Sequence, residues 1–482
     1  MTKNFHFFIN NRSRTSTEKR EILNPFTNEI LGNVYWPDVS DIDEAIEGAF
    51  TVFKQYSKIP SYKREALLLK IEKQVSEKAS EFIEMIVAES GKAISDAKIE
   101  VDRACRAFHL AAEETKRSGG NVIEMDNWEI SKNKIGIVTR IPLGVLLAVT
   151  PYNFPFYFIS LKIASAIATG CPLILVPSSK TFLTASTLGE IIKDLSMPEG
   201  SINIFPCDGL ELEEILSNPK IDIFSFTGNS QKGLYLKDKA KNKKIILETG
   251  GMACAIIDEY NDLNYAAERC AKGAFANAGQ MYISLQKILI NKDLYSEFTN
   301  EFMKEVQKIR VGDPSNPKTH YGPLIDDMAT AKVMEIIEDA VSKGAKLIAG
   351  GKNQGNIIPP TIIIKTDKDM EIEKNVCFGP VVTLCPYNDM KEAVEMINCS
   401  QSSVQAGIFS ENINRIFTYY NSLEMGSIII NDIPSFRADH MPYGGYKKSG
   451  LGQEGVKYNI DQLTQGKLLV LSFEHAPEWK GI

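Results

Sequence analysis

Four polar side chains have the chemistry to act on a small ligand. Glu248 ends the apolar run Ile245–Leu247, and a carboxylate buried there would have its pKa raised by loss of hydration. The phenol of Tyr282, with an ordinary pKa of about 10, is an acid and not a nucleophile at neutral pH. Arg103 and Arg437 carry guanidinium forks, which suit phosphate, phosphonate or carboxylate groups. Together these residue types suit acid–base chemistry on an anionic ligand.

Some of these side chains also have a structural interpretation, which the sequence leaves open. Glu248 could accept hydrogen bonds from the amides of Gly250 and Gly251, which follow its strand. The arginines could instead form ion pairs within a helix or between domains, and the candidate carboxylates are Asp102, Glu113 and Asp439.

Composition narrows the class of protein. With 482 residues, two or three domains are expected. The 54 basic and 61 acidic side chains give a net charge of −7 with no basic stripe, which argues against nucleic acid as a partner. The eight cysteines lack Cys-x-x-Cys spacing or a histidine partner, so we expect reduced thiols and no metal site. Residues 1–8 lack an apolar signal core, and polar residues interrupt the apolar stretch 135–176. We therefore expect a cytoplasmic protein without a membrane span.

The elements that must position these residues follow an α/β pattern. Helical periodicity dominates residues 40–118, with helices expected at Asp41–Gln55, Lys63–Glu89 and Glu100–Arg117. From Gly144 short apolar strands alternate with helices, which predicts a parallel sheet that can bind a nucleotide at the carboxyl ends of its strands. A second α/β series follows from about Tyr265. Its expected strands are Ile357–Ile364, Val381–Pro386 and Gly426–Ile430.

Motifs along the chain resemble those of the aldehyde dehydrogenase superfamily, in the order that family has them. They are Asn24-Pro25-Phe26-Thr27, Thr150-Pro151-Tyr152-Asn153-Phe154-Pro155, Phe226-Thr227-Gly228-Asn229-Ser230, Leu247-Glu248-Thr249-Gly250-Gly251, Gly312-Asp313-Pro314, Phe378-Gly379-Pro380 and Gly444-Gly445-Tyr446-Lys447-Lys448-Ser449-Gly450. The stretch Phe436–Pro442 looks most like the lactaldehyde and phosphonoacetaldehyde dehydrogenase branch. Any one motif is weak, but their shared order is a strong signal.

The resemblance implies an aldehyde-dehydrogenase-like α/β fold in three parts. A Rossmann-type dinucleotide-binding domain would comprise residues 1–119 and 144–250, and a catalytic domain would comprise residues 251–462. Residues 120–143 and 463–482 would form a β arm for oligomerisation, because edge strands favour pairing with a second subunit. A homodimer or homotetramer is therefore expected.

The resemblance also assigns roles to residues. Asn153 matches the family's oxyanion donor and Glu248 its general base, although Asn153 could simply serve a turn before Pro155. Phe275–Ser284 resembles the nucleophile loop, in which Tyr282 occupies the cysteine position. A phenol does not readily form the family's thiohemiacetal, so oxidation by the usual covalent route is not expected. Cys254 and Cys377 lie off this loop and are not expected to replace the thiol.

Three interpretations of Tyr282 remain open. It could donate a proton to the carbonyl oxygen of a small anionic aldehyde, as in an NAD(P)-dependent oxidoreductase without a covalent intermediate. It could plug the tunnel of a catalytically inactive binding subunit. It could also form an acid–base pair with Glu248 in a non-redox enzyme. The resemblance of residues 100–103 to a tunnel-lining helix favours an anionic substrate held by Arg103 or Arg437.

The expected cofactor is NADP or NAD, and two family anchors for its riboses are replaced. Val176 stands where the family has a lysine, and Val376 where it has a glutamate. Ser179 replaces the glutamate of NAD-preferring relatives, so a 2′-phosphate would not be repelled there. Lys180 could pair with that phosphate, which mildly favours NADP over NAD. Lys180 could equally be a solvated residue at the start of a helix. The full set of expected cofactor contacts is Thr150, Tyr152, Ser178, Ser179, Lys180, Gly209, Gly228, Asn229, Gly233, Thr249 and Phe378.

Overall fold

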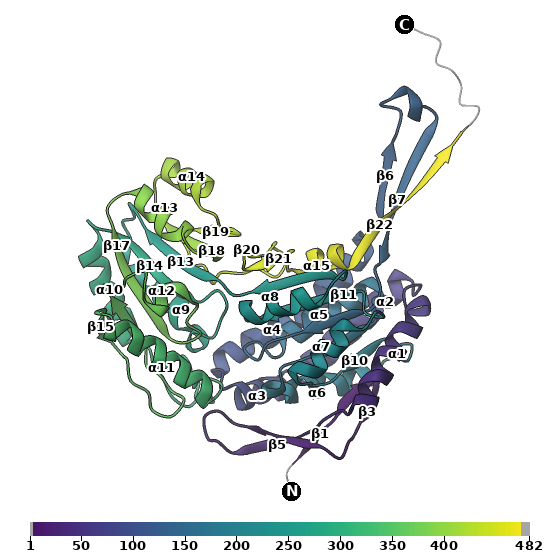
Figure 1. Ribbon diagram of the computed structural model, residues 1–482, viewed down its shortest axis with the longest axis horizontal. Helices are drawn as coiled ribbons and strands as arrows, with labels where there is room; N and C mark the ends of the chain where they lie inside the picture. The colour runs from purple at the N-terminus through teal and green to yellow at the C-terminus, as the bar shows by residue number, and fades with distance from the viewer. Residues whose placement is uncertain (1–2, 474–482) are drawn as a thin grey trace.

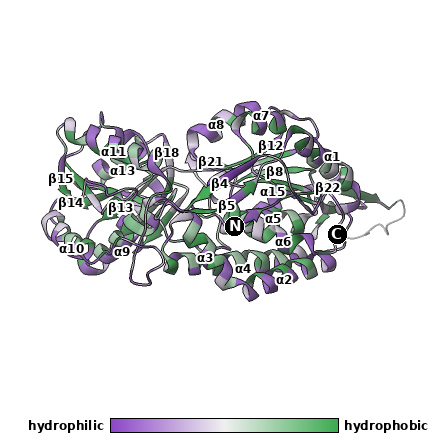
Figure 2. Cartoon of the chain, turned by 90° about the horizontal axis from the view of Figure 1, so that it is seen from below, coloured by the Kyte–Doolittle hydropathy of each residue, from purple (hydrophilic) through white to green (hydrophobic). Residues whose placement is uncertain are grey.

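The chain forms two lobes, each built around a central sheet, and an arm that projects from one of them (Figure 1). The computed structural model describes residues 3–473, so residues 474–482 of the predicted arm lie outside the described part. Apolar strands fill the interior and the polar faces of helices lie outside (Figure 2). None of the helices in residues 3–473 is both long enough and apolar enough to cross a bilayer.

The first lobe contains a sheet of order β21-β12-β11-β8-β9-β10-β2-β3, whose five central strands are parallel. Its strands are β21 (Gly450–Leu451), β12 (Lys244–Thr249), β11 (Ile223–Gly228), β8 (Leu146–Val149), β9 (Leu173–Val176), β10 (Ile202–Ile204), β2 (Phe7–Ile9) and β3 (Arg12–Arg14). Beside it lies a small sheet of β1 (Asn4–Phe5), β5 (Ile30–Tyr35) and β4 (Lys19–Leu23). Strands β8 and β9 are continuous apolar runs because helices cover both of their faces.

The helices of this lobe come from the first 240 residues. They are α1 (Val39–Tyr56), α2 (Ser61–Glu77), α3 (Ala79–Ser90), α4 (Ile94–Arg117), α5 (Tyr157–Thr169), α6 (Phe182–Lys193), α7 (Gly209–Ser217) and α8 (Ser230–Lys239). Every residue of α5 is buried, including Lys162, which explains why this helix is mostly apolar on all sides and not amphipathic.

The second lobe contains a sheet of order β15-β16-β17-β14-β13-β18-β19, with β20 paired to β18. Its strands are β15 (Lys346–Ala349), β16 (Thr361–Ile364), β17 (Val381–Tyr387), β14 (Leu285–Asn291), β13 (Met252–Ile257), β18 (Ser402–Phe409), β19 (Ser427–Ile430) and β20 (Tyr446–Lys447). Its helices are α9 (Leu263–Phe275), α10 (Tyr295–Gln307), α11 (Asp327–Ser342), α12 (Glu371–Lys374), α13 (Met390–Asn398) and α14 (Ile413–Ser422). The last helix, α15 (Val456–Leu463), packs against α5 of the first lobe.

The arm is an antiparallel sheet of order β22-β7-β6 (Figure 1). Its strands are β6 (Gly120–Glu124), β7 (Lys134–Pro142) and β22 (Thr464–Ser472). Strands β7 and β22 pair antiparallel, with Arg140 opposite Gly466 and Lys134 opposite Ser472, so segments from both parts of the predicted arm lie side by side.

The α/β fold class predicted from the sequence is confirmed, but some elements differ. The single helix predicted over Lys63–Glu89 is wrong, because the chain leaves helical geometry at Lys78 and forms α2 and α3. The strand predicted over Ile357–Ile364 begins only at Thr361, since Pro359 and Pro360 have no N–H to give to a ladder. Strands β13, β14 and β18 are not predicted. The proposed bounds of the three domains stay a prediction.

Candidate functional site

The site lies where the strand order of the first sheet reverses. From β8 the chain moves outward through β9 and β10, then returns to place β11 and β12 on the other side of β8. The carboxyl ends of β8 and β11 therefore border a crevice, which is where open α/β sheets bind ligands. The segment Pro151–Asn153 leaves β8 there, and Gly228–Ser230 joins β11 to α8.

A cavity of about 260 Å³ fills this crevice. The first lobe supplies its wall from the loops after β8, β11 and β12. The second lobe supplies one face of α11, the loop before β17 and Tyr282. Its lining residues are Pro151, Tyr152, Asn153, Gly228, Asn229, Ser230, Gly250, Tyr282, Ala329, Lys332, Val333, Ile336, Val376 and Phe378. The volume, the lobe junction and the few polar groups are typical of a small-molecule site.

A strained loop carries Tyr282 to the cavity. Asn277, Ala278 and Gly279 all have positive φ, at 50°, 55° and 71°. A Cβ on Gly279 would lie 2.0 Å from the carbonyl oxygen of Gly379, so a glycine is required there. Left-handed backbone at non-glycine residues is costly and concentrates at functional sites.

The side chain of Tyr282 packs against two aromatic rings and accepts a hydrogen bond from an arginine. Its ring lies 5.4 Å from that of Tyr443 and 5.8 Å from that of Phe158, and the side chain is 9% exposed. Its hydroxyl oxygen accepts a hydrogen bond from Arg437 Nη1. Burial raises the pKa of Tyr282, and the charge of Arg437 offsets only part of this rise, so the phenol stays protonated at neutral pH.

Behind Tyr282 runs a buried chain of charges. Arg437 Nη2 donates to Glu454 Oε1 at 2.7 Å, and Lys162 Nζ donates to Glu454 Oε2 at 3.2 Å. Burial opposes ionisation of Glu454, but Lys162 and Arg437 outweigh it and lower its pKa. The two cations and one carboxylate leave a net positive charge in the interior next to the phenol.

Glu248 lies at the end of β12 and is 2% exposed. Burial, reinforced by the charge of Glu454, raises its pKa well above the usual range, as the sequence predicts. Its Oε1 atom is buried without a hydrogen-bond partner among residues 3–473. Glu248 is not among the residues that line the cavity, and its predicted role as general base stays a prediction.

The amide of Asn153 is already engaged. Its Nδ2 donates to the carbonyl oxygen of Gln280 at 2.7 Å, while its backbone carbonyl accepts from Asn277 Nδ2 at 3.3 Å. These bonds tie the loop after β8 to the loop that carries Tyr282. The predicted oxyanion role of Asn153 stays a prediction; the bond to Gln280 uses one of the two N–H groups of the amide.

The two candidate substrate arginines both have acidic partners. Arg103 donates to Asp439 Oδ1 at 2.7 and 3.0 Å, which is one of the ion pairs that the sequence left open. Its guanidinium carbon also lies 3.9 Å from the centroid of the Tyr157 ring. Arg437 lies 5.7 Å from the same centroid, so Arg103 on α4 and Arg437 on the loop before β20 approach one aromatic side chain.

The predicted cofactor residues divide into two groups. Tyr152, Gly228, Asn229 and Phe378 line the cavity, together with the replaced anchor position Val376. The other seven lie outside its lining: Thr150, Ser178, Ser179, Lys180, Gly209, Gly233 and Thr249. Of these, Gly233 lets α8 pack closely, since a Cβ there would lie 2.8 Å from Thr249 Cγ2. Gly209 is exposed at the start of α7, where a Cβ would meet no atom within 4 Å.

Sequence reasoning missed the face of α11. Ala329, Lys332, Val333 and Ile336 line the cavity at spacings of three and four residues, which the helical pattern contains. That spacing marks one face of a helix but not what the face meets, because apolar helix faces usually pack into a core.

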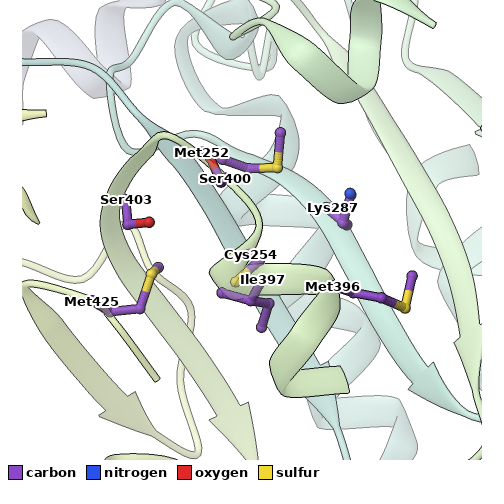
Figure 3. Close-up of a pocket in the computed structure, with 8 residues that line it drawn as sticks. All are labelled: Met252, Cys254, Lys287, Met396, Ile397, Ser400, Ser403 and Met425. Atoms are coloured by element: carbon purple, nitrogen blue, oxygen red, sulfur yellow. The ribbon is translucent and has the colours of Figure 1, made fainter. Parts of the chain in front are cut away.

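Neither Cys254 nor Cys377 is among the residues that line the cavity with Tyr282. Figure 3 shows Cys254 in a separate small hollow with Lys287 and three methionines, away from the cavity that Tyr282 lines. Burial raises the pKa of Cys254 to about 12 and that of Cys377 to about 12, so neither is a thiolate at neutral pH. Among the described residues, no group of three or more His, Cys, Asp or Glu side chains could hold a metal ion.

Comparison with known proteins identifies the class of this fold and site. The sequence profile described as "Aldehyde dehydrogenase family" matches residues 12–469. The chain is 32% identical over 471 residues to the 3-sulfolactaldehyde dehydrogenase of Priestia megaterium, covering 98% of each chain. It is 36% identical over 459 residues to the lactaldehyde dehydrogenase of Methanococcus vannielii, covering 94% of this chain and 97% of the relative.

Solved structures agree with the sequence comparison. Aldehyde dehydrogenase 21 of Physcomitrella patens, in complex with the reaction product succinate, superimposes with a TM-score of 0.96 at 35% identity, covering 98% of this chain and 99% of that one. The NADP-dependent glyceraldehyde-3-phosphate dehydrogenase of Bacillus halodurans C-125, complexed with NADP, gives a TM-score of 0.94 at 30% identity, covering 97% and 99%. The chain therefore belongs to the aldehyde dehydrogenase family. The family and fold expected from the sequence motifs are confirmed.

Proposed function

We propose that this protein is a nicotinamide-dinucleotide-dependent oxidoreductase that acts on a small anionic aldehyde without a covalent thiol intermediate. The observation that carries the proposal is the cavity of about 260 Å³ at the strand-order reversal, which reaches Tyr282 at one end. The relatives named for sulfolactaldehyde and lactaldehyde, and the structures that hold NADP and succinate, support this class of ligand.

The residues present fit the pyrophosphate end of such a cofactor better than its ribose end. Gly228, Asn229 and Ser230 bring the N-terminus of α8 to the cavity, and free N–H groups there favour a phosphate. The side chains of Val376 and Ala329 offer no acceptor for ribose hydroxyls. We therefore expect weaker affinity for the dinucleotide than a carboxylate at residue 376 would give. When bound, the nicotinamide would supply or accept a hydride.

The chain's own residues would manage the proton and the substrate's charge. Tyr282 is protonated and lines the cavity, so its phenol can donate a proton to a carbonyl oxygen placed there. Three buried polar atoms near it lack partners among residues 3–473, namely Arg437 Nε, Tyr157 Oη and Tyr443 Oη. Such unpaired donors support a binding place for an anionic group beside Arg437.

A second candidate function is a non-catalytic binding subunit with Tyr282 as a plug. The bond from Arg437 to the phenol supports it, because the Tyr282 hydroxyl takes the donor that an anionic substrate would use. The third alternative, an acid–base pair of Tyr282 with Glu248, gains no support from a contact, since the phenol bonds to Arg437.

The arm supports assembly of two or four copies. Its outer strand β22 has unpaired backbone groups on one edge, and Leu468, Leu469, Val470 and Leu471 are 39–55% exposed. An exposed apolar edge strand of this length favours pairing with another chain. The proposed partner is a second copy of this protein.

The test is titration calorimetry with NADP, NADPH, NAD and NADH, followed by NADPH consumption with carboxylated and sulfonated short-chain aldehydes. Dissociation constants in the micromolar range and turnover support the oxidoreductase. Tyr282→Phe keeps the ring but removes the proton, so turnover should fall by about 10²-fold or more while binding is retained. Binding without turnover in the wild type would favour the binding subunit. No binding at millimolar nucleotide would refute the oxidoreductase and leave Tyr282 as a plug or as an acid–base residue in non-redox chemistry.

A further inference from the structure

An ion pair joins the two lobes near the cavity. Lys180 belongs to the 3₁₀ turn Ser179–Thr181, which follows β9 of the first sheet. Its Nζ contacts Oδ2 of Asp326, the N-cap residue of α11 in the second lobe. The two side chains are 43% and 32% exposed, so solvent and large ligands can reach the pair.

Two contacts place this pair at the rim of the cavity. Asp326 Oδ1 accepts a hydrogen bond at 2.8 Å from the backbone N–H of Ala329, which lines the cavity. Lys180 Nζ lies 5.8 Å from the centroid of the Tyr152 ring, which also lines it. The pair therefore stands beside the carboxyl end of β9, where the second strand of such a sheet presents its residues to the adenosine ribose.

We propose that Asp326 sets the cofactor selectivity of this protein by competing with the 2′-phosphate of NADP for Lys180. The inference rests on the proposed function, because it concerns the same dinucleotide. A 2′-phosphate would need the Lys180 ammonium as its counter-charge and would meet the Asp326 carboxylate at the same place. NAD has only a hydroxyl at this position and leaves the ion pair in place.

The consequence is a weaker preference for NADP than Lys180 alone would give. The sequence offers Lys180 as a free cation, whereas the fold provides a carboxylate from residue 326 that neutralises it. Asp326 is thus a specificity-determining residue that does not contact the reacting atoms.

Asp326→Asn is a conservative test, because asparagine is as good an N-cap as aspartate and keeps the bond to the Ala329 amide. The variant should bind NADPH about 3- to 10-fold more tightly, as expected for removing one partner of a part-exposed ion pair and one repulsive charge, with NADH affinity changed less than about 2-fold. Asp327→Asn is the matched control, since it removes the neighbouring exposed charge without touching Lys180.

A mutant cycle isolates the competition. In a Lys180→Met background NADPH affinity should fall, and the gain from Asp326→Asn should be smaller than in the wild type, because the competition for the cation is absent and only the direct repulsion of the 2′-phosphate by Asp326 is removed. Affinities for 2′,5′-ADP and 5′-AMP repeat the comparison between a ligand with the 2′-phosphate and one without it, in the absence of the nicotinamide half. The gain for Asp326→Asn should appear with 2′,5′-ADP and shrink as salt is raised.

The outcomes separate this inference from the proposed function. Nucleotide binding that Asp326→Asn leaves unchanged, or raises equally for NADH and NADPH, overturns the role of Asp326 and leaves the oxidoreductase standing. An equal gain from Asp327→Asn also overturns it, because the effect is then general charge. Absence of binding by all four nucleotides overturns both.

Discussion

The decisive residue is Tyr282, and its effect goes beyond removal of a thiol. The phenol fills space beside the cavity and takes a hydrogen bond from Arg437, which is also bound to Glu454. Around it, Glu248 remains buried, with its pKa raised and one oxygen unpaired. The proposed acid–base roles of Glu248 and Tyr282 rest on these contacts, and in the proposed function the phenol takes the position of the family's nucleophile without forming a covalent bond to the substrate.

Restoring a thiol should create aldehyde oxidation. Tyr282→Cys removes the ring, frees a donor of Arg437 and places a nucleophile beside the cavity, near the strand end that carries Glu248. We expect oxidation measured by NADPH formation to rise at least about 10-fold above the wild type, with stability lowered by about 2–4 kcal/mol through the lost ring.

Tyr282→Ser is the matched control for that experiment. It opens the same space without a thiol, so it should lose comparable stability and gain no oxidation. Equal oxidation by the serine variant would contradict the thiol argument. If neither variant oxidises aldehyde although both still bind nucleotide, the replaced cofactor contacts at Val176 and Val376 also limit the reaction.

The buried and half-buried cysteines of this protein should react slowly with alkylating reagents. Burial raises the pKa of Cys105 to about 11 and that of Cys207 to about 12, whereas Cys399 is exposed. Since the thiolate is the reactive form, iodoacetamide at pH 8 should modify Cys399 first. Labelling of Cys105 should rise about 10-fold per pH unit from pH 8 to 9.5, because this range lies below its raised pKa.

Peptide mass spectrometry measures these rates residue by residue, and heat-denatured protein gives the reference rate for each cysteine. Rapid labelling of Cys254 or Cys377 in the folded protein would reveal an activated thiol. It would reopen the possibility that one of them replaces the missing nucleophile.

At the scale of elements, the loop before β14 fixes the site. Three consecutive residues in the left-handed region turn the chain sharply, and Gly279 passes against the carbonyl of Gly379. The loop is also tied to Asn153 by two hydrogen bonds, so its geometry and that of the β8 loop are coupled.

Gly279→Ala should therefore destabilise the protein by at least about 2 kcal/mol, because the new Cβ is strained and would overlap backbone atoms. The measurement is the free energy of unfolding from urea denaturation. Gly209→Ala is the control, since its Cβ meets open space in the first turn of α7 and should change stability by less than about 1 kcal/mol. A similar cost at both positions would refute the close approach at Gly279.

Individual elements show where local patterns succeed and where they fail. The runs Leu146–Val149 and Leu173–Val176 are predicted because strands covered on both faces are continuously apolar. Strand β18 is not predicted because Ser403 and Gln405 are polar, although both are buried in a strand that has neighbours on both sides. The break between α2 and α3 at Lys78 is not predicted, because the apolar spacing typical of a helix continues across this single non-helical residue.

At the scale of the whole molecule, the arm has apolar side chains that the other residues in the range 3–473 leave exposed. Substituting Leu469→Glu together with Leu471→Glu should shift the oligomer toward monomer, because two charges would have to be buried in the proposed contact. Light scattering after size-exclusion chromatography measures the mass. Gln465→Glu, on the same strand at a polar position, should leave the mass unchanged. A monomeric wild-type protein would contradict the proposed assembly.

The sequence by itself determined the family, the α/β class, the hairpin-plus-strand arm and the absence of a thiol at residue 282, because motifs and periodicity are local in the chain. The raised pKa of Glu248 was also predictable, since it follows from burial at a strand end. Only the tertiary structure decided which partner each charge takes. Arg103 meets Asp439 and Lys180 meets Asp326 across 336 and 146 residues of chain, and such pairings depend on how the two lobes pack.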